Sequence, residues 1–225
     1  MLWSVPESGD ERTDWPVSPP PPWPASVRAT LWWHRSTPAA REFGPDGPVV
    51  PMTLAMMVDY RDSPVGPYHE VLASPVLRRG LIPAMAVPFI AVDSESSVHG
   101  GREHWKLPKV LADFSGDVLG NFTAAGEEWT VRTSASPRGP QLPIAGGLTF
   151  AQPGENGELH RASARLRGRF RYARVTVDAE GPTLSRWLRS GTHHGIVITS
   201  GSMATGPAHI AGQGVSVDSR QSTES

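Results

Sequence analysis

The chain has 225 residues, which suits one globular domain with a sizeable core and short tails. Its 21 basic and 22 acidic residues give a formal net charge of −1, which argues against nucleic acid or an acidic membrane surface as a partner. It has no cysteine, so disulfide bonds and thiolate metal sites are excluded. No signal peptide and no membrane-spanning apolar run can be recognised, so we expect a cytoplasmic protein.

Residues 1–25 are acidic and rich in proline (VSPPPPWPAS), which predicts a flexible, extended N-terminal arm. A single β domain is expected over residues 26–205, followed by a flexible tail over 206–225. Within the domain, short segments rich in β-branched, aromatic and other apolar residues end at proline, glycine or aspartate, as strands do. The predicted strands are 27–33, 51–60, 84–92, 127–133, 146–151, 161–174 and 195–200.

The segment 161–174, RASARLRGRFRYAR, alternates most regularly. Its arginines Arg165, Arg167, Arg169 and Arg171 are expected on one face of a strand, with the apolar residues between them and Tyr172 facing the core. A solvated outer face is the simplest interpretation of the arginines, because acidic residues elsewhere balance their charge. An anionic ligand, nucleic acid or a subunit interface are the alternatives.

Two short helices are predicted. One begins at Pro108, since proline suits a first helical turn, and runs to Asp113. The other covers 183–189 and is closed by Gly191. Many strands with few helices predict a mainly β (α+β) fold, in which a curved antiparallel sheet closes into a cone or barrel. The neighbouring residues His193 and His194 would point to opposite faces of a strand, so no metal site is predicted.

The basic residues comprise 19 arginines and two lysines, and both lysines lie in the stretch GREHWKLPKVLADF. Arginine stays protonated in proteins, whereas lysine can lose its proton and then attack a carbonyl group. A bias toward arginine explains why lysine is scarce, but it does not explain why Lys106 and Lys109 lie together. Lys109, flanked by Leu107 and Val110, is therefore a candidate nucleophile; a surface lysine at a helix start is the alternative.

The run VDSESSVHGGREHWKLPKVLADF resembles the core motif of the acetoacetate decarboxylase family, in which an acidic D-x-E turn is followed by G-R-E and then P-K. The matching residues here are Asp93 and Glu95, 101–103, and 108–109. Upstream, GPYHEVL is similar to the family's G-x-Y-x-E segment, and VRATLWWHR is similar to its first strand. The resemblance covers about residues 27–113.

This resemblance implies a β cone or barrel around an apolar pocket, and a lyase that needs no cofactor and assembles into homo-oligomers. Lys109 would form a Schiff base with a small keto acid. Glu70 would transfer a proton or orient the substrate, and Arg28 would bind a substrate carboxylate. Trp105 and Glu103 are expected to contact the substrate, although Glu103 could equally hold its loop by ion pairs.

Two departures from the family pattern leave alternatives open. The decarboxylases carry a second lysine directly beside the catalytic one, where this chain has Val110, and a further acidic residue where it has Ala55. An aldolase or dehydratase that forms the same imine with a 2-oxo acid is therefore an alternative to a decarboxylase. A non-catalytic barrel that binds a small acid, or an interaction protein that uses the proline arm and the arginines, are further alternatives. Whether Lys106 tunes Lys109 is also open.

Overall fold

The computed structural model describes residues 16–43, 49–79, 82–154 and 156–210. Strands dominate these residues, as the sequence predicts. The strands are β1 Trp23–His34, β2 Val49–Asp62, β3 Tyr68–Arg79, β4 Ile82–Met85, β5 Phe89–Val92, β6 Lys109–Leu111, β7 Asp113–Gly116, β8 Asn121–Ala125, β9 Thr130–Pro153, β10 Leu159–Glu180, β11 Gly191–Thr205 and β12 His209–Ile210. Because β9 is 24 residues long, the strand predicted at 146–151 and most of the one at 127–133 belong to a single element.

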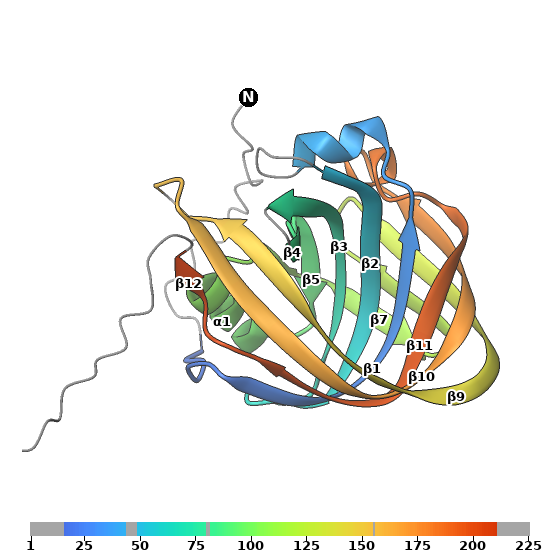
Figure 1. Ribbon diagram of the computed structural model, residues 1–225, viewed down its shortest axis with the longest axis horizontal. Helices are drawn as coiled ribbons and strands as arrows, with labels where there is room; N and C mark the ends of the chain where they lie inside the picture. The colour runs from blue at the N-terminus through green and yellow to red at the C-terminus, as the bar shows by residue number, and fades with distance from the viewer. Residues whose placement is uncertain (1–15, 44–48, 80–81, 155, 211–225) are drawn as a thin grey trace, which may run out of the picture.

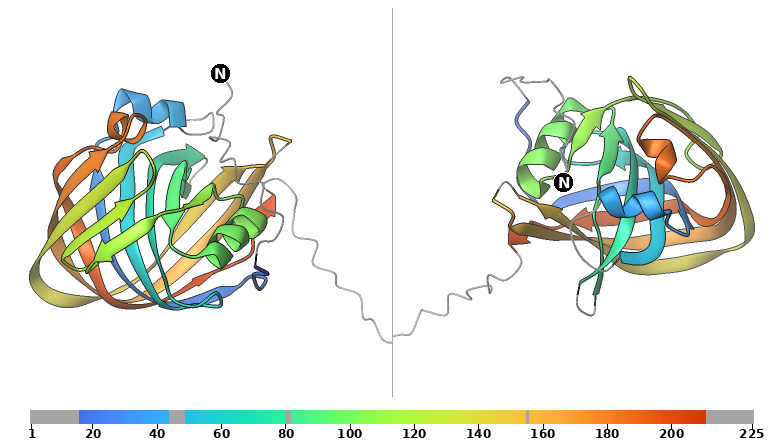
Figure 2. Two further views of the ribbon diagram at one scale, coloured as in Figure 1. Left: turned by 180° about the vertical axis from the view of Figure 1, so that it is seen from behind. Right: turned by 90° about the horizontal axis from the view of Figure 1, so that it is seen from above.

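Hydrogen bonds join the strands into one curved sheet in the order β12-β10-β11-β1-β2-β3-β4-β9-β8-β7, with β5 pairing with β3 and β6 beside this path. β9 also pairs with β10, so the order of pairing returns on itself. Among the described strands, only the pairs β4–β9 and β5–β6 are parallel. Figures 1 and 2 show β9, β10 and β11 curving around the shorter strands. The prediction of a mainly β fold with a curved sheet is confirmed.

Two apolar clusters lie on opposite faces of the central strands. In β2, Met56 and Val58 belong to one cluster, while Ala55 and Met57 belong to the other. Successive side chains of a strand point to opposite faces, so this alternation buries β2 on both sides. The cluster that contains Met56 and Val58 also surrounds the cavity described below.

The arginine-rich strand changes its buried face along its length. Arg165, Arg167 and Arg169 share an exposed face, as predicted, but the same face of β10 carries the buried Val175 further along. Tyr172, predicted to face the core, is 58% exposed instead. The reason is that β10 runs from one apolar cluster to the other, so each of its faces is buried over only part of the strand.

The prediction of a helix that begins at Pro108 is wrong. Residues 109–111 form strand β6, which pairs with Ile90–Val92 of β5. The helix lies just before it: α1 covers Glu95–Trp105, and the Ser94 side chain caps it by accepting a 3.2 Å hydrogen bond from the Ser97 amide. Lys106 ends α1 in the left-handed conformation, with φ 56°. The glycines of the G-G-R-E sequence suggest a turn, which explains why this helix was not predicted.

The second predicted helix, 183–189, is reduced to the 3-10 turn η2 Leu184–Arg186. A further 3-10 helix, η1 Pro38–Phe43, lies beside it, and the Phe43 and Trp187 rings stack with centroids 5.6 Å apart. Figures 1 and 2 show these two turns together, away from α1. No helix in the described ranges is both long and apolar enough to cross a membrane.

The packed domain extends beyond its predicted limits at 26 and 205. At the N-terminal end Ser18 is buried, and its hydroxyl lies within hydrogen-bond distance of ring nitrogens of His99 and His104. At the C-terminal end Gly206 accepts a hydrogen bond from the Trp105 indole, and β12 follows. Regular structure therefore reaches past both predicted limits, since β1 starts at Trp23 and β12 covers His209–Ile210. The flexibility of the arm and the tail stays a prediction, and most of both segments lies outside the described residues.

Candidate active site

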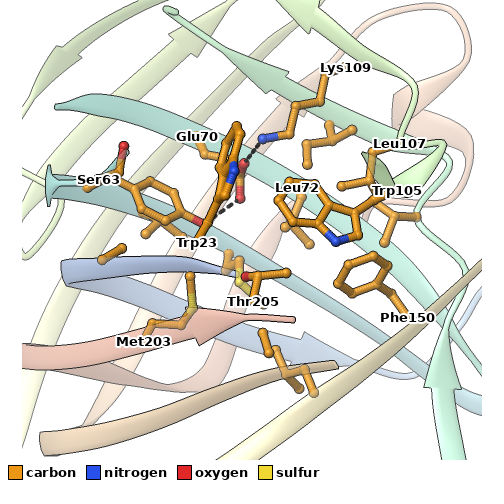
Figure 3. A pocket seen from close by; sticks show the side chains of 18 of the residues that line it. Trp23, Ser63, Glu70, Leu72, Trp105, Leu107, Lys109, Phe150, Met203 and Thr205 are labelled. Carbon is orange, nitrogen blue, oxygen red and sulfur yellow. Dashed lines mark hydrogen bonds and ion pairs between the residues drawn. The ribbon is translucent and has the colours of Figure 1, made fainter. Parts of the chain in front are cut away.

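The motif lysine is buried and has two polar partners. Lys109 opens β6 and is 3% exposed. Its Nζ atom donates a hydrogen bond to Glu70 Oε2 at 2.8 Å (Figure 3) and another to Ser97 Oγ at 2.9 Å. Glu70 is 4% exposed, so a potential cation and a potential anion face each other out of contact with water. A buried lysine and a buried glutamate stay charged only when each has an oppositely charged or hydrogen-bonding partner, as Lys109 and Glu70 have here.

Glu70 is held by the strand pairing around it. In β3 it shares a face with Tyr68, two residues earlier, and Tyr68 pairs with Tyr60 across the β2–β3 hairpin. The Tyr60 hydroxyl donates to Glu70 Oε1 at 3.2 Å, and the two tyrosine rings stack with centroids 4.2 Å apart. Both carboxylate oxygens of Glu70 therefore accept a hydrogen bond, Oε1 from Tyr60 and Oε2 from Lys109.

The tyrosines remain neutral hydrogen-bond donors over the physiological range. Burial, reinforced by the carboxylate of Glu70, raises the pKa of Tyr60 well above its usual value. The same two causes raise the pKa of Tyr68. The ring centroid of Tyr68 lies 5.4 Å from Lys109 Nζ, within the range of a cation–π contact when the amine is protonated.

Helix α1 fixes the position of the lysine from the other side. Ser97, in its first turns, supplies the hydroxyl beside Nζ. Arg102 Nε donates a 2.9 Å hydrogen bond to the backbone carbonyl of Lys109. Gly101 lies so close to the lysine stem that a Cβ at this position would be 2.5 Å from Lys109 Cδ. The G-R-E segment therefore acts here as a support for Lys109.

Lys109 and Glu70 lie at the wall of a small cavity of about 100 Å³. Most of its surface is apolar, and its lining includes Trp23, Leu72, Trp105, Leu107, Phe150 and Met203 (Figure 3). Among the described residues that line it, Lys109 and Glu70 are the only charged ones. Sites that bind small molecules typically have an apolar wall with a few polar groups, as this cavity has. Its volume suits a ligand of few atoms.

The cavity includes some of the predicted site residues and leaves out others. Lys109, Glu70 and Trp105 line it together, which brings the G-x-Y-x-E segment and the P-K motif to one place. Glu103 does not line it: its side chain is 56% exposed and lies 3.3 Å from His99 within α1. Of the two roles considered for Glu103, only the ion pair therefore has a contact in the structure.

Arg28 does not line the cavity either, so the structure does not bring it together with Lys109 and Glu70. In β1, Val27 and Ala29 face the cluster around the cavity, so alternation turns Arg28 to the opposite face. There its guanidinium binds Asp59 at 2.8 Å and lies 3.6 Å from Asp117.

Lys106 is likewise outside the cavity and exposed at the end of α1. The residue beside Lys109 in sequence, Val110, packs partly buried against the other apolar cluster. Among the described residues, no second lysine lines the cavity.

Sequence reasoning missed three polar residues of this site. Tyr68 could have been found, because it lies two residues before Glu70 and must share its strand face. Tyr60 follows from the hairpin Tyr60–Tyr68, whose proline- and glycine-containing turn sets the register. Ser97 gave no such signal, since it is one of three serines in SESS and its position depends on a helix that was not predicted.

No group of three or more histidine, aspartate or glutamate side chains within the described ranges is arranged to hold a metal ion. This holds for His193 and His194 as well: His193 lies beside a backbone carbonyl at 2.8 Å, and His194 lies beside Arg174. The candidate site therefore consists of amine, carboxylate and hydroxyl groups in an apolar cavity.

No curated protein matches this chain. An acetoacetate decarboxylase of known structure is similar with a TM-score of 0.67 at 14% identity, covering 86% of this chain and 90% of that one. An acetoacetate decarboxylase from Legionella pneumophila gives 0.62 at 12% identity, covering 91% and 93%. The enduracididine biosynthesis enzyme MppR, complexed with pyruvate, gives 0.61 at 15% identity, covering 93% and 97%.

At these identities the structural similarities show a shared fold. A stronger finding comes from the sequence, because the family model for acetoacetate decarboxylase (ADC) matches residues 40–186, which is more than half of the chain. That range contains both Glu70 and the motif around Lys109. The chain belongs to the acetoacetate decarboxylase family.

Proposed function

We propose that this protein is a lyase that acts on a small keto acid through a Schiff base on Lys109. The observation that carries the proposal is the buried Lys109 amine at the wall of an apolar cavity, 2.8 Å from the carboxylate of Glu70. A carboxylate at this distance can accept the proton that the ammonium must lose before it attacks a carbonyl carbon. Membership of a family whose structural relatives include enzymes supports catalysis over simple binding.

The proposed reaction balances without a cofactor. Glu70 takes a proton from the ammonium, and the neutral amine of Lys109 adds to the ketone carbon. Glu70 returns the proton to the hydroxyl group formed there, and water leaves to give a protonated imine. The electrons of the bond to the carboxyl carbon move into the imine, and carbon dioxide departs. The resulting enamine takes a proton at carbon, and water hydrolyses the imine to release the ketone and restore the lysine. Glu70 and the neutral phenol of Tyr60 are the proton-carrying groups nearest to these steps.

The charge of the cavity favours a β-keto acid over a 2-oxo acid. Arg28 is on the other face of β1, and Lys109 is the only cationic residue among those that line the cavity. Once Lys109 has become the imine, a substrate carboxylate has no further cationic partner there. An apolar surrounding then destabilises the carboxylate relative to carbon dioxide, which has no charge, and so assists its loss.

Condensation or dehydration chemistry on a 2-oxo acid is the second candidate. It is supported by Val110, which replaces the adjacent lysine of the decarboxylases, and by the similar fold of MppR, whose structure contains pyruvate. Both candidates share the imine on Lys109 and differ in which bond breaks.

Nuclear magnetic resonance of 13C-labelled substrates separates the two candidates. We expect the protein to convert acetoacetate to acetone and carbon dioxide above the spontaneous rate, and Lys109→Met to remove the excess. Turnover of pyruvate with an added aldehyde, in the absence of turnover of acetoacetate, would select the second candidate. No lysine-dependent turnover of either acid would contradict the enzymatic proposal.

A further inference from the structure

The strands around Arg28 form an open groove on the sheet face to which Arg28 points. The groove has a volume of about 460 Å³, and three of its lining residues are Arg28, Arg61 and Arg167. They come from β1, from its neighbour β2, and from β10, which is separated from β1 by β11 alone. The remaining lining residues are small apart from Val27: they are glycines and the hydroxyl residues Ser26, Thr199, Ser200 and Ser202.

Strand pairing places several of these side chains next to one another across three adjacent strands. Ser202 of β11 pairs with Ser26 of β1 on one side and with Arg167 of β10 on the other. Paired residues of adjacent strands point to the same face of the sheet. One arginine and two serines therefore converge from three strands, and Arg28 lies two residues along β1 from Ser26.

Two β-bulges flank Arg28 and direct additional groups to this face. In β11, Ile198 pairs with Ala29 and Gly201 pairs with Val27, so two residues of β11 oppose Arg28. In β2, Asp62 pairs with Ser26 and Tyr60 with Val27, which makes Arg61 the extra residue. A bulge re-aims side chains locally, and bulges are common beside functional sites. Here they bring Thr199 and Arg61 into the groove wall.

The positive charge of the groove is only partly neutralised. The Asp59 carboxylate binds Arg28 at 2.8 Å and lies 3.6 Å from Arg61, which holds both guanidinium groups in place. Asp117 lies 3.6 Å from Arg28 at the periphery, and Asp62 is exposed beside Ser26. No hydrogen bond or ion pair engages Arg167 in the part of the chain that the structure describes, and its partners in the strand pairing are Ser202 and Ala145.

Backbone contacts make the floor of the groove shallow and rigid. A Cβ at Gly168 would be 2.2 Å from the carbonyl oxygen of Ser200 and 2.8 Å from Gly201 Cα. Only glycine permits this approach of β10 to β11, so the backbone lies close enough to the surface for a ligand to reach hydroxyl and guanidinium groups together.

We propose that this groove binds a small phosphate-bearing molecule. Guanidinium groups match the oxygens of phosphate in paired hydrogen bonds, and hydroxyl groups add neutral donors that carry no competing charge. Asp59 and Asp117 neutralise most of the charge of Arg28 and Arg61, whereas Arg167 has no ion pair among the described residues, so its guanidinium remains available to phosphate oxygens. This site is separate from the cavity of Lys109 and independent of the chemistry proposed there, because Arg28 and Val27 face opposite sides of β1.

Isothermal titration with inorganic phosphate, at an ionic strength held constant with sodium chloride, tests the proposal. We expect one saturable site per chain, tighter for phosphate than for acetate. Arg167→Gln should weaken phosphate binding by about tenfold or more, the effect of losing a charge-assisted hydrogen bond. Arg165→Gln is the matched control, since it removes an exposed charge from the same face of β10 outside the groove, and it should change binding by no more than about twofold.

Three outcomes would overturn the proposal. Equal weakening by Arg167→Gln and Arg165→Gln would mean that phosphate senses only the general charge of the strand. Loss of binding in Lys109→Met would place the phosphate in the cavity instead. Absence of saturable binding, together with a change in sedimentation mass for Arg167→Gln, would assign the groove to contact between copies of the chain.

Discussion

Gly101 of α1 and the side chain of Lys109 lie in direct contact, with no room for a methyl group between them. The helix and the strand that carry them are joined by only three residues, 106–108. The stem of the lysine therefore follows the surface of the helix until Nζ reaches Ser97 and Glu70. The position of the amine is set by backbone packing as much as by its hydrogen bonds.

Gly101→Ala should move the amine and impair the reaction. Alanine favours the helix by about 1 kcal/mol, but overpacking against the lysine stem costs ~1–3 kcal/mol, so we expect a net loss of stability. A shift of the amine of about 1 Å should lower the rate of imine formation by roughly 100-fold. Gly120→Ala is the control, since a Cβ there would approach no atom more closely than the Asp117 carbonyl oxygen at 3.9 Å. Equal imine formation in the two variants, measured by trapping with borohydride, would contradict this role of Gly101.

Glu70→Gln keeps the shape of the side chain and removes its charge. Lys109 then loses the only carboxylate that it contacts in the cavity, and breaking a buried pair in this way costs about 3–5 kcal/mol. We expect urea denaturation to show a loss of this size, and turnover to fall by about 100-fold or more because the proton acceptor is gone. Tyr60→Phe is the milder comparison: it removes one hydrogen bond to Glu70 and should cost about 1 kcal/mol. A fully active Glu70→Gln would exclude Glu70 from proton transfer.

Lys106→Gly should stabilise the protein without changing the reaction. Lys106 ends α1 in a left-handed conformation, where glycine avoids a strain of about 1 kcal/mol. Its side chain is exposed and does not line the cavity, so we expect the thermal midpoint to rise and imine trapping to stay the same. A clear drop in trapping would mean that the charge of Lys106 acts on Lys109.

A pH-dependent ion pair joins β3 to the turn before α1. The hydrogen bond that the His69 ring donates to the Asp93 carboxylate raises the pKa of His69, although burial opposes this, and the contact is 2.7 Å long. Burial would raise the pKa of Asp93, but its hydrogen bonds with the His69 ring and amide outweigh burial and lower it. The histidine contribution to stability is complete below its unfolded pKa of ~6.5 and is lost as the pH rises through the higher folded value.

The aspartate contribution is complete above its unfolded pKa of ~3.9 and is lost as the pH falls through the lower folded value, so the pair stabilises most between about pH 4 and 6.5. We expect Asp93→Asn to lose up to about 1 kcal/mol in this window and less above pH 8, since both groups are partly exposed. Denaturant unfolding of both proteins at pH 5.5 and 8.5 checks this. His34, whose pKa is lowered by burial, makes an opposite contribution to the pH dependence of stability. This contribution is the same in both proteins, so it cancels when their stabilities are subtracted at each pH. A larger loss at pH 8.5 would contradict the assignment.

The sequence allowed the class of the fold and the two charged residues of the cavity to be predicted, but not the geometry between these residues. The alternation of apolar and polar residues along 161–174 identified a strand, because this spacing can be read from the segment itself without knowledge of its partners. Lys109 and Glu70 were found through motifs. Arg28 does not join them in the cavity: its motif match did not specify which face of β1 it occupies, and alternation with Val27 places it on the opposite face.

The helix before Lys109 could not be predicted for a different reason. Its two glycines disfavour a helix locally, and both are required by contacts from distant parts of the chain: Gly100 with Trp23 and Gly101 with Lys109. The groove at Arg28 likewise depends on bulges, which appear only when β1, β2 and β11 are paired. Long-range packing of this kind leaves no periodic signal in the sequence.

Reductive trapping tests the central claim most directly. The protein is incubated with acetoacetate and, separately, with pyruvate, reduced with sodium borohydride, and digested for peptide mass spectrometry. We predict a reduced adduct on Lys109 that forms with acetoacetate more readily than with pyruvate and is absent from Lys109→Arg, in which the guanidinium cannot form the imine. An adduct on Lys106 instead of Lys109, or equal labelling of wild type and Lys109→Arg, would contradict the assignment of Lys109 as the reacting amine.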